Sequence, residues 1–256
     1  MNPIKKVLGC FRKADNDYHM IEDGDRIAVG VSGGKDSSCL IHCLHLYKNF
    51  SKKNFDVIGI YVDLGFGQQH MDEVIEYFRP YDIPIYVVET QIYDILKLHL
   101  DKEDRIECSL CAKLRKGALV NAAKAHGCNK IALGHHSDDA VETLFMNMIN
   151  GGRLATFKPK MLLERSGVTM IRPLVYAYEH DISRMADKLE MPLSKNACPN
   201  SGHTERQAMK DMLNSLYKDY PSSKNNFQLM LRNHKQVDIF QPENDDEEDI
   251  QERIMP

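Results

Sequence analysis

The chain has 256 residues, 43% of them hydrophobic, and a formal net charge of −4. This length suits one ordinary domain with additions, and the apolar content is enough for a sizeable core. No apolar run approaches the roughly 20 residues that a membrane span requires, so we expect no membrane association. The first 20 residues are charged and predict a short amphipathic helix, not a signal peptide, which favours a cytoplasmic protein.

Charge is unevenly distributed along the chain. Residues 241–256 contain seven acids and one base, a net charge of −6, which leaves residues 1–240 with +2. The acidic tail predicts a solvated, disordered segment, whereas the mildly basic body is compatible with a nucleic-acid partner. Because thiols stay reduced in the cytoplasm, the seven cysteines favour core residues, metal ligands or catalytic groups over a disulfide framework.

Strand-like apolar runs alternate with helical patterns over the first 175 residues. We expect strands at 27–31, 57–62, 84–88, 130–134 and 168–172. We expect helices at about 36–48, 69–80, 92–100, 110–126 and 138–149, and further helices at 178–190, 204–218 and 223–235. The alternation predicts an α/β fold, a parallel sheet with helices on both faces, followed by a helical C-terminal extension. The expected parts are an N-terminal helix (1–20), the α/β domain (21–175), the extension (176–240) and the tail (241–256).

The first predicted strand runs into Ser32-Gly33-Gly34-Lys35-Asp36-Ser37, after which a helix begins. Adjacent glycines permit positive φ and let an anion approach the backbone closely. The first N–H groups of the helix and its dipole favour negative charge. Lys35 adds a positive charge, and Asp36 is suited to hold a metal ion on phosphates. The segment therefore predicts a phosphate site, although its order differs from that of a Walker A loop.

Polar residues also follow other predicted strands, and ligands of parallel sheets bind at the carboxyl ends of strands. Asp63 ends the second strand, where it either meets a ribose hydroxyl or adenine amino group or caps a turn. The fourth strand ends in Gly134-His135-His136-Ser137-Asp138-Asp139. Acids at a helix start are favourable on dipole grounds alone. The cluster also suits Mg²⁺–phosphate chemistry, with Asp36 or Asp139 as the ligand and His135 as a donor to phosphate.

Three cysteines stand out from the other four. Cys108 and Cys111 form a CxxC pair at a helix start, where the dipole and nearby bases are expected to lower the pKa of the thiols. Cys198 supplies a third thiol in a polar stretch. The trio is compatible with a structural zinc site completed by His203, with a redox pair that passes sulfur, or with an iron–sulfur cluster that leaves one iron without a protein ligand.

Five segments together resemble one family. They are SGGKDS (32–37), CSLCAKLRKGAL (108–119), LGHHSDDAVETLFMNMINGG (133–152), IRPL (171–174) and ACPNSGHTERQAMKDML (197–213). The first resembles the PP-loop of the N-type ATP pyrophosphatases, which cleave ATP between its α and β phosphates. The whole set, in this order over nearly all of residues 4–235, resembles the TtcA-type tRNA 2-thiolation enzymes. The resemblance implies a Rossmann-like sheet of the adenine nucleotide alpha hydrolase type.

The same resemblance assigns roles to residues. It implies that Cys108, Cys111 and Cys198 bind a [4Fe–4S] cluster, and that ATP and Mg²⁺ are the other cofactors. In the mechanism that we expect from these residues, Lys35, Asp36 and Asp139 are catalytic, with Asp36 or Asp139 on Mg²⁺. The nucleotide-binding residues would be Ser32, Gly33, Gly34, Lys35, Asp36, Ser37, Ser38, Asp63, Gly134 and His135. One departure is Lys195, because family members often carry a further cysteine at that position.

The expected partners are a tRNA and a sulfur donor, either a cysteine desulfurase or sulfide, with a homodimer as the expected assembly. Residues 151–167 are glycine-containing and basic, as suits a loop that contacts a phosphate backbone or an ordinary solvated connection. The residues expected to contact RNA are Arg153, Lys158, Lys160, Arg172 and Arg206.

The leading hypothesis is ATP-dependent tRNA thiolation, which forms 2-thiocytidine after adenylation of the C2 oxygen of the base. Thiolation of another tRNA base stays open. So does an aminating PP-loop ligase that resembles lysidine synthetase, with zinc at the cysteine site. A nucleotide- and RNA-binding module without turnover is the alternative outside the enzymes.

Overall fold

The computed structural model describes residues 2–67, 71–100, 105–194, 198–200, 204–233 and 235. Lys195, His203 and the acidic tail (241–256) lie outside these residues. The chain divides into two compact units, Met1–Ser215 and Leu216–Pro256. Among the described residues, no helix has both the length and the apolar character needed to cross a membrane.

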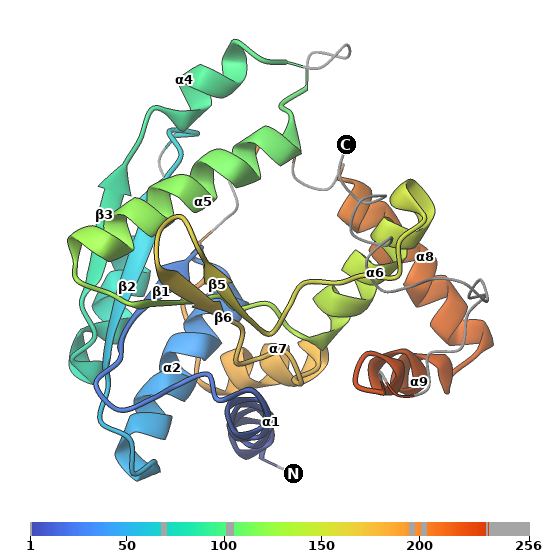
Figure 1. Ribbon diagram of the computed structural model, residues 1–256, viewed down its shortest axis with the longest axis horizontal. Coiled ribbons are helices and arrows are strands. Elements are labelled where there is room, and N and C mark those ends of the chain that lie inside the picture. Colours follow the sequence, from blue (N-terminus) through green and yellow to red (C-terminus); the bar gives the residue numbers. More distant parts are fainter. Residues whose placement is uncertain are drawn as a thin grey trace, which may run out of the picture. The chain divides into compact units, whose positions relative to one another are not determined.

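A six-stranded sheet in the order β3-β2-β1-β4-β6-β5 forms the centre of the first unit (Figure 1). The strands are β1 (Arg26–Val31), β2 (Asp56–Asp63), β3 (Ile85–Glu89), β4 (Lys130–Ala132), β5 (Lys160–Leu163) and β6 (Val168–Ile171). Neighbouring strands pair in parallel except for β5, which is antiparallel to β6. The predicted α/β class is therefore confirmed, with an antiparallel edge strand added.

The strand β5 lies inside the segment 151–167, which the sequence led us to expect as a connection without a strand. None of the four residues of β5 is β-branched or aromatic, so local preference gives little indication of a strand. The strand forms because it pairs with β6. In the turn between the two strands, the Gly167 N–H donates to the Leu163 carbonyl (2.9 Å). Gly167 has a φ of 71°, which favours glycine.

Helices cover both faces of the sheet, as the alternating pattern predicts. The helices are α1 (Pro3–Tyr18), α2 (Lys35–Phe50), α3 (Asp72–Phe78) with the 3₁₀ turn η1 (Arg79–Tyr81), α4 (Ile92–Lys97), α5 (Cys108–Ala125), α6 (Ser137–Gly151), α7 (Glu179–Lys188), α8 (Glu205–Asp219) and α9 (Ser223–Met230). One buried cluster joins α1, α2, α3 and α7 to one face, and a second joins α4 and α5 to the other. Figure 1 shows α1, α2 and α7 on one side of the sheet and α5 on the other. Helix α1 lies within the N-terminal segment 1–20, and its Val7 and Phe11 are fully buried.

Strand β1 shows how the sequence builds these two faces. Its residues Ile27, Val29 and Val31 belong to the cluster under α1 and α2, whereas Ala28 belongs to the cluster under α5. This is the period-two alternation of a strand, with both faces apolar because helices cover both sides. Strand β1 lies between β2 and β4, and the chain leaves β1 and β4 toward opposite edges of the sheet. The carboxyl ends of β1 and β4 therefore flank a topological switch point, where ligands of such folds bind.

The segments after β1 and β4 pack against each other at this switch point. A Cβ atom on Gly134 would lie 2.9 Å from the backbone carbon of Asp36 and 3.0 Å from the Ser37 nitrogen. Real Cβ atoms essentially never approach backbone so closely, so glycine is required at this position. The first turn of α2 is thereby brought against the β4–α6 connection.

This packing predicts that Gly134→Ala displaces the first turn of α2 and lowers the free energy of unfolding by about 1–3 kcal/mol, the usual effect of overpacking. Chemical denaturation measures this loss, and calorimetric titration of ATP measures the expected weakening of nucleotide binding. The matched control is Gly117→Ala in the exposed interior of α5, where an added Cβ meets nothing within 4 Å. That control is expected to raise stability by about 0.5–1 kcal/mol. Equal effects of the two substitutions would contradict the packing argument.

Candidate active site

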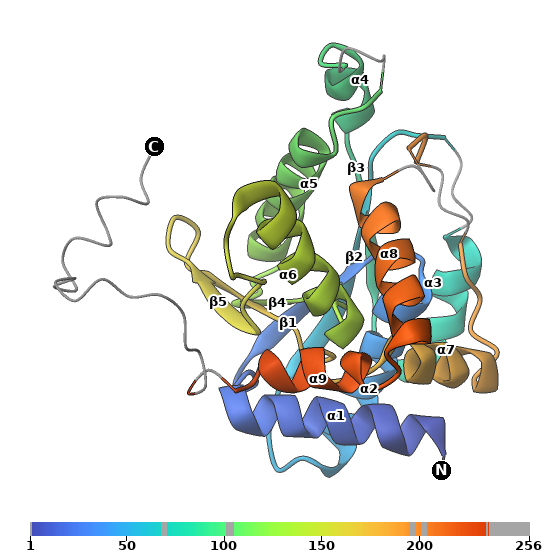
Figure 2. The ribbon, with the colours of Figure 1, turned by 90° about the vertical axis from the view of Figure 1, so that its right-hand side faces the viewer.

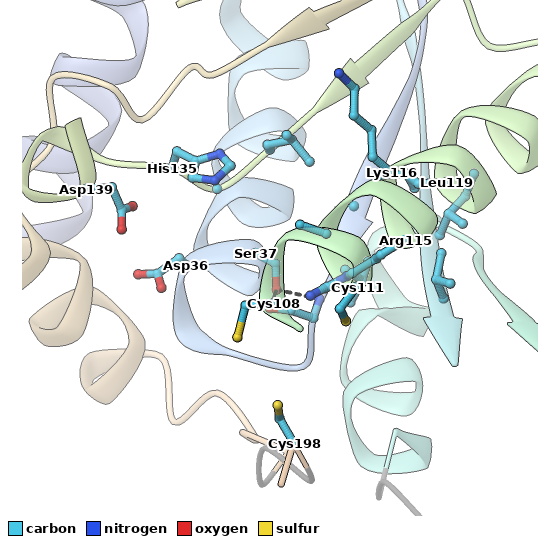
Figure 3. A pocket seen from close by; sticks show the side chains of 18 of the residues that line it. Asp36, Ser37, Cys108, Cys111, Arg115, Lys116, Leu119, His135, Asp139 and Cys198 are labelled. Carbon is cyan, nitrogen blue, oxygen red and sulfur yellow. Dashed lines mark hydrogen bonds between the residues drawn. The ribbon is translucent and has the colours of Figure 1, made fainter. Parts of the chain in front are cut away.

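A cavity of about 620 Å³ opens at the switch point. Figure 3 shows side chains from the predicted phosphate site after β1 (residues 32–37, the phosphate loop), from the segment after β4 and from the first turns of α5 around this space. The lining includes Ser32, Asp36, Ser37, His135, Asp139, Cys108, Cys111 and Cys198. Residues that are as much as 166 positions apart in the sequence therefore meet in one cavity, as the carboxyl-edge rule predicts.

Hydrogen bonds between residues of the phosphate loop fix its conformation. The Ser32 N–H donates to Ser37 Oγ (3.2 Å), and Ser37 Oγ donates to the Gly34 carbonyl (3.0 Å). Gly34 is the N-cap of α2 and no side chain caps this helix. Gly33 has a φ of 76°, in the region that favours glycine. The first N–H groups of α2 and its dipole are thus suited to bind an anion.

The two charged residues of the loop form ion pairs with each other and with α7. Lys35 Nζ lies 3.2 Å from Asp36 Oδ1 and 3.1 Å from Glu179 Oε1. Burial opposes the charged form of Lys35, but the carboxylates of Asp36 and Glu179 outweigh burial, so the pKa of Lys35 is raised. Asp36 Oδ1 is buried and accepts no hydrogen bond from the described residues. That carboxylate oxygen is the group in the loop best suited to bind Mg²⁺, a cation that prefers oxygen ligands.

The segment after β4 begins α6 with a capping box. The Asp139 N–H donates to His136 Nδ1 (3.3 Å), and the His136 N–H donates to Asp139 Oδ2 (2.9 Å). The other oxygen of Asp139 accepts from Arg206 (3.2 Å). Both oxygens of Asp139 accept hydrogen bonds, whereas Asp36 Oδ1 accepts none from the described residues although it pairs with Lys35, so Asp36 is the more available metal ligand of the two.

His135 and Asp63, which we predicted to contact the nucleotide, differ in the structure from what we expected. Burial lowers the pKa of His135 to about 4, so this residue lines the cavity as a neutral imidazole. Asp63 Oδ1 accepts from the Gly65 N–H (2.8 Å), which is the turn-capping alternative. Asp63 lies outside the described lining of the cavity. Ser38 is buried and also lies outside that lining, whereas Gly134 is part of it.

The three distinctive cysteines line the same cavity. Asn200 joins their two segments, because its Nδ2 donates to the Ile106 carbonyl (2.7 Å) and to Cys108 Sγ (3.5 Å). Figure 3 shows the sulfur of Cys198 pointing toward the helix that carries Cys108 and Cys111. The expectation of lowered thiol pKa values is wrong for Cys111. Burial and the proximity of Cys198 raise its pKa, against the opposing charge of Arg115.

These thiols are soft sulfur donors of the kind that an iron–sulfur cluster needs. In the described part of the chain, no three His, Cys, Asp or Glu side chains lie close enough to hold one metal ion. A four-iron cluster spreads its thiolate ligands further apart than one ion does and needs soft sulfur donors. A cavity wall that carries three cysteine side chains and no further described cysteine provides such a donor set.

The basic residues expected to contact RNA fall into two groups. Arg153 and Lys158 are exposed in the connection after α6. Arg172 is buried, donates through Nη1 to the Lys158 carbonyl (2.6 Å) and lines the cavity. Arg206 pairs with Asp139, and Lys160 donates to the His19 carbonyl. Of the five basic residues expected to contact RNA, Arg153 and Lys158 are thus the two that are exposed.

Some residues at the site were not identified from the sequence. Glu179 and Lys210 surround Lys35, and Arg115 and Lys116 line the cavity. Glu179 is the first residue of a helix, where an acid is favourable because of the helix dipole. Its position in the sequence therefore gives no indication of the contact with Lys35. Lys210 lies within an amphipathic helical pattern and carries no signal of its own. The sequence indicates Arg115 and Lys116 only as bases near the CxxC pair, not as residues that line the cavity.

The fold and the phosphate loop define a class, and sequence similarity agrees: the PP-loop domain family matches residues 8–215. The chain is a PP-loop protein. Three relatives named tRNA-cytidine(32) 2-sulfurtransferase align with this chain over most of its length and most of their own. The one from Geobacter metallireducens is 36% identical over 90% of each chain, the one from Geotalea daltonii 38% identical over 90% and 91%, and the one from Syntrophotalea carbinolica 39% identical over 85% and 83%. The chain therefore belongs to the family of TtcA-type tRNA 2-thiolation enzymes.

Solved structures agree on the fold. The U34-tRNA thiolase NcsA from Methanococcus maripaludis, with its [4Fe-4S] cluster, superposes with a TM-score of 0.72 at 25% identity, covering 92% of this chain and 80% of NcsA. The NAD⁺ synthetase from Burkholderia pseudomallei, at 13% identity and a TM-score of 0.51, shares the fold over 92% of this chain and 90% of its own.

One buried carboxyl near the site predicts a pH-dependent stability. Glu142 in α6 is 5% exposed, and burial and the charge of Asp139 raise its pKa from 4.5 to about 7. The unfolded state then ionises first as pH rises, so Glu142 destabilises the fold progressively from about pH 4.5 to 7 and fully above that range. Glu142→Gln removes this penalty. Its stability relative to the natural chain is expected to be higher at pH 8 than at pH 5 by about 1–3 kcal/mol. Denaturant unfolding at both values measures it, and a difference that is independent of pH would contradict the argument.

Proposed function

We propose that this protein is an ATP-dependent tRNA thiolation enzyme that replaces the C2 oxygen of a cytidine by sulfur, forming 2-thiocytidine. The observation that supports it most directly is that a single cavity is lined by phosphate-loop residues and by all three distinctive cysteines. The names of the relatives point to cytidine 32 of tRNA, and the NcsA structure associates the same fold with a [4Fe-4S] cluster.

The activation step would use the phosphate loop and Lys35. The cytidine O2 attacks the α-phosphorus of ATP, the bond to the bridging oxygen breaks, and pyrophosphate leaves. The N–H groups at the start of α2 and the hydroxyls of Ser32 and Ser37 bind the β and γ phosphates. Lys35 neutralises the charge that develops on the departing pyrophosphate. Asp36 would hold Mg²⁺ on the phosphates, because its Oδ1 has no other hydrogen bond among the described residues.

The sulfur step would take place beside the cysteine side chains. Cys108, Cys111 and Cys198 would hold a [4Fe–4S] cluster, which when bound supplies one iron without a protein ligand as a site for inorganic sulfur. Sulfur attack at C2 then releases AMP, a far better leaving group than the original oxygen. Sulfide would supply the sulfur directly, whereas the persulfide of a cysteine desulfurase would first need two electrons from a thiol to release its outer sulfur as sulfide. Arg115 and Lys116 line the same cavity, where their positive charge would favour the departure of AMP.

The tRNA substrate would present an unstacked cytidine, because a paired base hides C2. Arg153 and Lys158 are the exposed candidates for contacts to its backbone. The proposal also includes a homodimer and a cytoplasmic location, which the molecular mass in solution and cell fractionation would test.

The cysteine assignment predicts the effect of removing one ligand. Cys198→Ser is expected to abolish the visible absorbance and Mössbauer spectrum of a four-iron cluster after anaerobic preparation, and to abolish 2-thiocytidine in tRNA from cells in which the variant replaces the natural chain. The control is Cys128→Ala, a buried cysteine outside the cavity lining, which is expected to retain both signals. A colourless natural protein with one tightly held zinc would overturn the cluster.

The assignment of backbone contacts predicts salt dependence. Lys158→Ala is expected to weaken tRNA binding and to lower the slope of log K against log salt by about 1, because one phosphate contact is lost. Fluorescence anisotropy over a range of salt concentrations measures this slope. The matched control is Lys188→Ala, which removes an exposed lysine from the last turn of α7. An unchanged slope for Lys158→Ala would place the RNA elsewhere.

A further inference from the structure

Glu179 lies between two ammonium groups beside the phosphate loop. Its Oε1 is 3.1 Å from Lys35 Nζ, and Lys210 Nζ donates to both of its carboxylate oxygens at 2.7 Å. Lys210 is on α8, whose first turns run beside α6 (Figures 1 and 2). One carboxylate thus connects the start of α2 to α8 through residues 144 and 31 positions away from it.

The position of Glu179 is itself fixed. It is the first residue of α7, and its backbone N–H donates to Asp138 Oδ2 (2.8 Å) in the first turn of α6. Its side chain stays ionised because, although burial acts in the opposite direction, Lys210 and Lys35 lower the pKa of Glu179 to about 2. At any physiological pH a full negative charge therefore lies between the two ammonium groups.

Lys35 needs such a partner. A lysine side chain is a flexible four-carbon stem that ends in a point charge, and its ammonium must be held where charge develops if it is to aid catalysis. Its other partner, Asp36, is the residue that we assign to Mg²⁺. If Asp36 binds a cation, Glu179 is the carboxylate that still pairs with the Lys35 ammonium. Without Glu179, the positive charges of Lys35 and Lys210 would repel each other.

We propose that Glu179 is a positioning residue for ATP cleavage, which holds the ammonium of Lys35 at the phosphate loop and is itself held by Lys210 of α8. The inference rests on the proposed function, since it concerns the step in which pyrophosphate leaves. It makes the loop lysine depend on a helix that follows Cys198 in the chain. On the same helix, Arg206 pairs with Asp139 (3.2 Å) and reaches Thr143 Oγ1 (3.5 Å), so α8 is fastened to the site at two places.

The first test is Glu179→Gln, which keeps the shape and the backbone hydrogen bond to Asp138 but removes the charge. In the holoenzyme with tRNA and ATP, kcat for pyrophosphate release is expected to fall about ten-fold or more, because a misplaced catalytic group loses at least this much. The Kd for tRNA and the melting temperature are expected to stay near those of the natural protein. Asp187→Asn, an exposed acid on the same helix, is the matched control.

A double-mutant cycle separates positioning from a merely structural role. If Glu179 acts through Lys35, then Glu179→Gln has little further effect, less than about two-fold, once Lys35→Met is already present. Equal losses in both backgrounds would overturn the proposal. Lys210→Met is expected to reproduce part of the loss and Lys210→Arg to restore it, with Lys218→Met on the last turn of α8 as the charge-matched control.

A second readout does not depend on turnover. Competitive acetylation followed by mass spectrometry reports how accessible and mobile each lysine amine is. In Glu179→Gln the rate at Lys35 is expected to rise several-fold, while the rate at Lys188 stays constant. An unchanged rate at Lys35 would overturn the positioning role even if the protein releases no pyrophosphate. Absence of tRNA-dependent pyrophosphate release from the natural protein, with the acetylation difference present, would overturn the proposed function alone.

Discussion

The close packing of the β4–α6 connection against the first turn of α2 is the constraint on which the site depends. Only a glycine at position 134 permits it, because a Cβ would meet backbone atoms of Asp36 and Ser37 at about 3 Å. This approach brings the phosphate loop, which follows β1, against the cluster that follows β4. The ordering β2-β1-β4 in the sheet then decides that the ligand lies between them.

Around this backbone contact, charged residues are arranged in a connected network. Lys35 pairs with Glu179, Glu179 with Lys210, and Arg206 with Asp139. The carboxylate of each pair is partly buried, so salt screens these pairs less than it screens fully exposed ones, and each pair holds long side chains in one geometry. The helices α6, α7 and α8 contribute one member or more each, so the electrostatics of the phosphate site depends on elements that follow it by more than a hundred residues.

The cavity also explains why nucleotide and sulfur chemistry can share one protein. The start of α2 offers backbone N–H groups to an anion, and the same cavity carries three thiols from two segments that the hydrogen bonds of Asn200 join. Adenylation and sulfur delivery need reacting groups to lie within bonding reach of one base, and a single cavity provides that proximity.

The sequence by itself determined the α/β class, the phosphate loop, the CxxC pair and the family, because these depend on local periodicity, on glycines and on the order of short motifs. It did not determine β5, whose residues have weak strand preference and which forms only by pairing with β6. It left Asp63 open between a ligand contact and a turn cap, and a hydrogen bond to the Gly65 N–H shows the cap. Only the tertiary structure placed Glu179 and Lys210 at Lys35, because ion pairs across such separations are set by how α7 and α8 pack, and charged residues on amphipathic helices do not reveal their partners in the sequence.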